Sequence, residues 1–212
     1  SPFAPRKGAS FAERKATLLR PPDDEFHQTQ GRSYFIEARD YFRMVPVIEF
    51  IDHSQINFAD ATYRWIVLKR FSFSDDSMEH RTLLDSLIRC RWYRDHYASA
   101  DSHEHDSKTI HGPYRLSEIT AESFEAVTAA EAGSVVDEFC NLDEFESPPT
   151  DAVKRQIATQ ITVRIDTAAS IFRLRQLDGA KHDWGDVLWE FRELVTISRT
   201  EHELGLIVMA ID

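Results

Sequence analysis

Histidines and carboxylates gather in one polar stretch of the sequence, and metal ligation is the chemistry that they could perform. Four of the nine histidines, His96, His103, His105 and His111, fall within sixteen residues that also contain several acidic side chains. Imidazole and carboxylate groups are common protein ligands of zinc and similar divalent ions. One hypothesis is therefore a metal-dependent hydrolase with His103, His105, Asp106 and His111 as ligands and a nearby acid as general base.

The spacing inside this stretch departs from familiar metal motifs. His103-Glu104-His105-Asp106-Ser107-Lys108 has serine and lysine where the His-x-His-x-Asp-His order of metallo-β-lactamase-type hydrolases requires Asp and His. The His-Asp pairs at residues 105–106 and 182–183 do not follow apolar helical segments that would bury an HD-type phosphohydrolase site. The other interpretation is a polar loop that is enriched in histidine by chance.

A second stretch, residues 116–153, contains ten carboxylates and no lysine, arginine or histidine. It carries nearly all of the net charge of −11, because the rest of the chain has 26 acidic and 25 basic residues. A local negative field can steer a basic protein partner. The residues expected to bind this partner are Glu118, Glu122, Glu125, Asp137, Glu138, Asp143, Glu144 and Glu146, with Trp189 as an aromatic anchor. The alternatives are a solvated face or internal pairing with arginines of residues 64–94.

Basic and aromatic residues alternate in Arg89-Cys90-Arg91-Trp92-Tyr93-Arg94, a composition that is also found where proteins contact nucleic acid or phosphate. Acidic residues flank this segment on both sides, and the negative charge of the chain would repel a polyanion. We therefore expect these arginines to pair with their acidic neighbours, and we expect no direct contact with nucleic acid.

Other function classes lack their sequence signals. The chain has no Gly-x-Gly-x-x-Gly, no Walker loop and no Gly-x-Ser-x-Gly. Its two cysteines, Cys90 and Cys140, form neither a disulfide framework nor a Cys-x-x-Cys pair, which favours a reducing compartment. No apolar run reaches the ~20 residues that span a bilayer. The sequence thus predicts a soluble cytoplasmic protein that does not enter the membrane.

The elements that would position these residues are predicted from apolar spacing. We expect an N-terminal arm over residues 1–32 and a single mainly α-helical domain, a bundle of about seven to nine helices, over residues 33–212. Residues 45–73 are ambiguous and could contribute a minor β element. The expected helices cover residues 33–45, 57–73, 77–97, two parts of 116–146, 151–177 and a segment that begins at Asp183. The apolar segment 204–211 is expected in the core or in contact with another chain.

Three hypotheses follow for the function. The first is a non-catalytic binding protein of the inhibitor, immunity or adaptor type, which docks a basic partner through its acidic face. The second is the hydrolase described above, with zinc or a similar ion as cofactor. The third is a structural subunit that buries residues 204–211 in an oligomer.

Overall fold

The computed structural model describes residues 47–58, 63–98, 109–142 and 148–212, which all belong to the compact unit Met44–Asp212. The arm predicted for residues 1–32, its boundary and the helix predicted for 33–45 lie outside the described residues.

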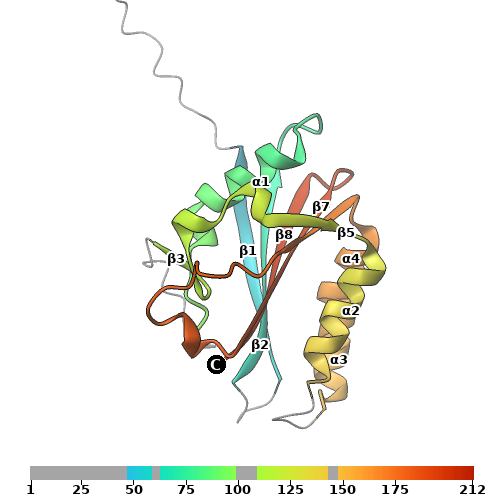
Figure 1. The fold of residues 1–212 in the computed structure, drawn as a ribbon. Helices are drawn as coiled ribbons and strands as arrows, with labels where there is room; N and C mark the ends of the chain where they lie inside the picture. The colour runs from blue at the N-terminus through green and yellow to red at the C-terminus, as the bar shows by residue number, and fades with distance from the viewer. Residues whose placement is uncertain (1–46, 59–62, 99–108, 143–147) are drawn as a thin grey trace, which may run out of the picture. The chain divides into compact units, whose positions relative to one another are not determined.

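The centre of the fold is a six-stranded antiparallel sheet with the order β1-β2-β8-β7-β6-β5 (Figure 1). Its strands are β1 (Ile48–Asn57), β2 (Arg64–Phe73), β5 (Phe124–Val127), β6 (Ser170–Leu174), β7 (Glu190–Ser198) and β8 (Glu203–Ile211). The last strand of the chain, β8, lies between β2 and β7 in the interior of the sheet. A separate hairpin is formed by β3 (Ile110–His111) and β4 (Tyr114–Arg115).

Helices cover both faces of the sheet (Figure 1). One face packs against α1 (His80–Arg89) and the short 3-10 turn η1 (Arg91–Tyr93). The other face packs against α2 (Ala129–Cys140) and a second helix, whose parts are α3 (Asp151–Ile157), the π-helical η4 (Ala158–Thr162) and α4 (Val163–Thr167). Further 3-10 turns are η2 (Leu116–Glu118), η3 (Ala121–Ser123) and η5 (Gly185–Val187).

The predicted helical bundle is wrong, because the central strands are buried on both faces. In β8, Leu204, Leu206 and Val208 enter the core beside α1, whereas Ile207 and Met209 enter the core beside α2. Every position from Leu204 to Ile211 is then occupied by an apolar residue or glycine, so the polar and apolar alternation of a half-buried strand disappears. A continuous apolar run of this length cannot be assigned to helix or strand from spacing alone.

The same cause accounts for the other misassigned segments. Residues 57–73, predicted as a helix, contain β2, and β1 and β2 form a hairpin of ten-residue strands rather than a minor β element. The helix predicted to begin at Asp183 is replaced by η5 and β7. The helix predicted for 151–177 ends at Thr167 and is followed by β6.

Local signals near chain reversals were more informative than apolar spacing. Thr150 caps α3 by accepting a hydrogen bond from the Val153 N–H, and Gly112-Pro113, a dipeptide typical of turns, joins β3 to β4. Within the described segments, no helix combines the length and apolar character that crossing a membrane would require.

Candidate binding surface

The segment between Lys181 and β7, residues 182–189, carries a concentration of exposed apolar side chains. Six large apolar residues are exposed in the described part of the chain, and three of them, Trp184, Val187 and Trp189, lie in this segment. The Trp184 side chain is 77% exposed. Because η5 is a 3-10 turn with three residues per turn, Trp184 and Val187 are placed on the same side of the segment. We call residues 182–189 the Trp184 segment.

His182 attaches this segment to the β3–β4 hairpin. Its Nε2 donates a hydrogen bond to the Gly112 carbonyl at 3.0 Å, and its Nδ1 accepts one from the Trp184 N–H at 3.1 Å. The His182 N–H also donates to the Pro113 carbonyl at 3.1 Å. Both ring nitrogens are therefore used in holding Trp184 in place, and the His182-Asp183 pair has no ring nitrogen left for a metal.

The hairpin turn depends on glycine at position 112. Gly112 has φ +52°, in the left-handed region, and the ring of Phe191 lies where a Cβ atom would be. A side chain at this position would strain the backbone and collide with the first residues of β7. The glycine thus allows the hairpin to approach β7 closely and support the Trp184 segment.

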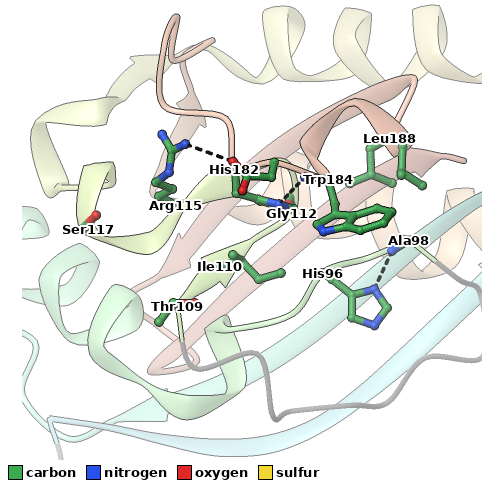
Figure 2. Close-up of a pocket in the computed structure, with 12 residues that line it drawn as sticks. His96, Ala98, Thr109, Ile110, Gly112, Arg115, Ser117, His182, Trp184 and Leu188 are labelled. Atoms are coloured by element: carbon green, nitrogen blue, oxygen red, sulfur yellow. Dashed lines mark hydrogen bonds and ion pairs between the residues drawn. The ribbon is translucent and has the colours of Figure 1, made fainter.

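A cleft of about 570 Å³ lies between the hairpin and the Trp184 segment. Figure 2 shows Arg115 and Ser117 on one side of Ile110, and Trp184 and Leu188 on the other side. The cleft thus has a polar end and an apolar, aromatic end. An apolar side chain of a partner could enter the aromatic end, while polar groups at the other end fix its orientation.

Two exposed carboxylates border this surface. Asp183 lies 3.8 Å from Arg115, and its side chain is 94% exposed. Asp186 accepts a hydrogen bond of 2.7 Å from Lys181, and this bond lowers the pKa of the Asp186 carboxyl group. The Asp186 carboxyl group is thus ionised at neutral pH beside an exposed indole. Indole faces and carboxylates are the groups that attract lysine and arginine side chains.

The acidic residues singled out in the sequence do not form one uncompensated face in the described part of the chain. Three of them form ion pairs with arginines of the same chain: Glu122 with Arg81, Glu125 with Arg173, and Glu138 with Arg192. Glu118 in η2 and Asp137 in α2 are exposed and form no ion pair with any described residue. Asp143, Glu144 and Glu146 lie outside the described residues.

His111 is the described member of the proposed metal site, and its position does not suit a ligand. The ring is fully buried, with Nε2 2.6 Å from the Glu193 carboxylate and Nδ1 bonded to the Tyr93 carbonyl. Both ring nitrogens are therefore occupied by contacts within the chain, and neither is free for a metal. His103, His105 and Asp106 lie outside the described residues, and the described residues contain no group of three or more potential metal ligands.

His111 instead belongs to a buried polar network that the sequence did not reveal. The Lys69 Nζ donates to the Asp95 carboxylate at 2.9 Å and to the Trp92 carbonyl at 3.0 Å. The Tyr93 ring stacks on His111 at 3.6 Å, and its hydroxyl donates to Glu193 at 3.4 Å. Burial lowers the pKa of Lys69, although Asp95 opposes this effect. All these side chains are shielded from solvent, which indicates a structural role.

Comparison of the chain with protein-family models, with curated proteins and with solved structures found no match. The candidate surface therefore rests on geometry alone. Trp189, predicted as a partner anchor, is 52% exposed. Trp184 was missed because helical spacing placed it on a buried stripe with Leu188, Phe191 and Val195. The signal that could have found it is local, since Asp178-Gly179 and Gly185 interrupt any regular element around it.

Proposed function

We propose that this protein is a non-catalytic binding protein that docks a basic protein partner through the Trp184 segment and the adjoining cleft. The observation that carries the proposal is the exposure of Trp184, Val187 and Trp189 within six residues of one segment. Tryptophan is enriched among the residues that dominate binding energy at protein interfaces. An inhibitor, an immunity protein or an adaptor would use such a surface.

Charge supports a basic partner. The net charge of −11 favours encounter with a positively charged protein at low salt. At the surface itself, Asp183 and Asp186 flank Trp184 but already pair with Arg115 and Lys181, so a lysine or arginine of the partner would chiefly contact the exposed indole face. The long-range field would increase the association rate, and burial of the two indoles would slow dissociation.

The acidic stretch, residues 116–153, contributes less to partner binding in this proposal than its sequence suggested. Glu122, Glu125 and Glu138 already have arginine partners, so they add little local field for docking. We also propose a cytoplasmic location, which the free thiols of Cys90 and Cys140 support, because unpaired cysteines are typical of reducing compartments.

The experiment compares three forms of the protein as baits for partners from the source cell, followed by calorimetry with the purified partner. We expect a basic partner, and we expect the double substitution Trp184→Ala and Trp189→Ala to weaken its binding at least about a hundredfold, because each indole that anchors an interface contributes about 2 kcal/mol or more. The matched control is Val163→Ala, which truncates an apolar side chain that is 52% exposed on α4, near the opposite end of β8 from Trp189.

Val163→Ala should leave the affinity unchanged, and substitution of Asp183 and Asp186 by lysine should slow association and reduce its dependence on salt. The proposal would be abandoned if the partner bound the double tryptophan variant as tightly as the unmodified protein, or if the partner were acidic.

A further inference from the structure

A second surface stands out because its arginines form no side-chain hydrogen bond or ion pair with the described residues. Thirteen arginines lie in the described part of the chain, and nine of them form side-chain hydrogen bonds or ion pairs with described residues. The other four form none, and three of these, Arg89, Arg91 and Arg94, fall within six consecutive residues. We call these three residues the arginine cluster.

The local fold places these arginines close together. Arg89 is the last residue of α1, and Arg91 begins η1. Because a 3-10 turn has three residues per turn, the backbone places Arg91 and Arg94 on the same side. Arg89 and Arg91 are exposed, and Arg94 is half-buried. The Nε atom of Arg94 is shielded from solvent and has no hydrogen-bond partner among the described residues.

Trp92 fixes the position of Arg91. Its ring stacks on Phe50 of β1 with a centroid distance of 3.8 Å and an interplanar angle of 12°. The guanidinium carbon of Arg91 lies 4.9 Å from the centroid of the same ring. The indole is therefore occupied by contacts within the chain. It orients a guanidinium group and does not present a platform on which a nucleic-acid base would stack.

The expected pairing of these arginines with acidic neighbours is not found. Asp75 accepts hydrogen bonds from Ser77, Asp76 lies 3.3 Å from His202, and Asp95 is paired with Lys69. Asp85 precedes Arg89 by about one helical turn on α1 without forming an ion pair with it, and residues 86–94 contain the three arginines and no acidic side chain. This patch is therefore locally positive on a chain whose net charge is strongly negative.

We propose that the arginine cluster binds a single phosphate group, either inorganic phosphate or the phosphate of a monoester. Guanidinium groups match phosphate oxygens with paired N–H donors, and the resulting charge-assisted bonds are roughly twice as strong as neutral ones. A doubly charged tetrahedral anion can accept bonds from two or three arginines at once. The cluster uses α1 and η1, so this proposal is independent of the partner surface at the Trp184 segment.

Calorimetric titration of the full chain with inorganic phosphate and with phenyl phosphate, at low ionic strength, tests the proposal. We expect saturable binding at one site. Arg91→Gln and Arg94→Gln should each weaken it by about tenfold, since each removes one charge-assisted contact to the phosphate. The matched control is Arg155→Gln, which removes the fourth unpaired arginine, on α3.

Arg155→Gln should leave phosphate affinity unchanged. Tighter binding of phenyl phosphate would identify a monoester as the ligand, and equal binding would identify phosphate itself. Thermal unfolding of each variant separates loss of binding from loss of fold, and Arg89→Gln replaces any variant that unfolds. Absence of saturation, or an equal loss of affinity in Arg155→Gln, would refute the proposal.

Discussion

At the scale of single residues, the most unusual feature is the set of ionisable side chains inside the core beside α1. Lys69, Asp95, His111 and Glu193 are all at most 4% exposed and form two hydrogen-bonded pairs, Lys69 with Asp95 and His111 with Glu193. A buried pair compensates the cost of removing its charges from water only when further hydrogen bonds satisfy the remaining groups. Here the Trp92 and Tyr93 carbonyls supply such bonds.

Two buried oxygen atoms of this region, Glu193 Oε1 and the Tyr97 hydroxyl, lack a hydrogen-bond partner among the described residues, and the second leads to a prediction about stability. The Tyr97 hydroxyl is buried and forms no hydrogen bond with any described residue. A buried hydroxyl without a partner costs about 1 to 3 kcal/mol, so Tyr97→Phe should leave the free energy of unfolding unchanged or raise it by about 1 kcal/mol in urea titrations. The matched variant Tyr93→Phe removes the hydrogen bond to Glu193 and should lower it. A loss of more than about 1 kcal/mol in Tyr97→Phe would indicate a partner for the hydroxyl.

At the scale of elements, the sequence predicted starts and turns better than it predicted element types. Thr150 and Gly112-Pro113 act through their immediate neighbours, so their signals do not depend on the rest of the fold. The identity of β7 and β8 depends on helices far away in the sequence that cover both faces of the sheet. A short stretch of sequence does not contain this tertiary information. For the same reason, helical spacing wrongly grouped the exposed Trp184 with the buried Leu188 and Val195.

The attachment of α2 to the sheet gives a prediction at this scale. Arg64 of β2 is 2% exposed and donates hydrogen bonds to the last carbonyls of α2, at 3.2 Å to Phe139 and 3.0 Å to Cys140. Arg64→Met retains much of the apolar stem but leaves these carbonyls without a donor, so we expect a loss of about 1 to 3 kcal/mol in the free energy of unfolding. Arg155→Met, on an exposed part of α3, should change it by less than about 0.5 kcal/mol. An equal effect of the two substitutions would contradict the capping role of Arg64.

At the scale of the whole molecule, charge is distributed differently from the way the linear sequence suggested. The acidic stretch is contiguous in the chain, but Glu122, Glu125 and Glu138 meet arginines from α1, β6 and β7. Those arginines are 41 to 54 residues away in sequence, so no local count could reveal the pairing. Conversely, Arg89, Arg91 and Arg94 have acidic neighbours in sequence and no acidic partner among the described residues. Distance in the sequence therefore predicted neither the ion pairs that form nor the neighbours that do not pair.

The buried tyrosines make the stability of the whole fold sensitive to alkaline pH. Burial raises the pKa values of Tyr93 and Tyr97 well above 10, so above pH 10 the unfolded chain releases these protons first and stability falls by up to about 1.4 kcal/mol per pH unit for each tyrosine. Lys69 acts in the opposite sense, because its lowered pKa makes stability rise with pH until the unfolded lysine has titrated near 10.5.

The measurement is therefore best made above pH 10.5, by urea titration of the unmodified protein and of Tyr97→Phe. The pKa of Cys140 is raised to about 11, so its thiol adds to the decline in both proteins and cancels in the comparison. Tyr97→Phe should lose stability less steeply, because one of the two buried phenols is gone. Identical slopes would mean that Tyr97 is already ionised, or already reached by solvent, in the folded protein.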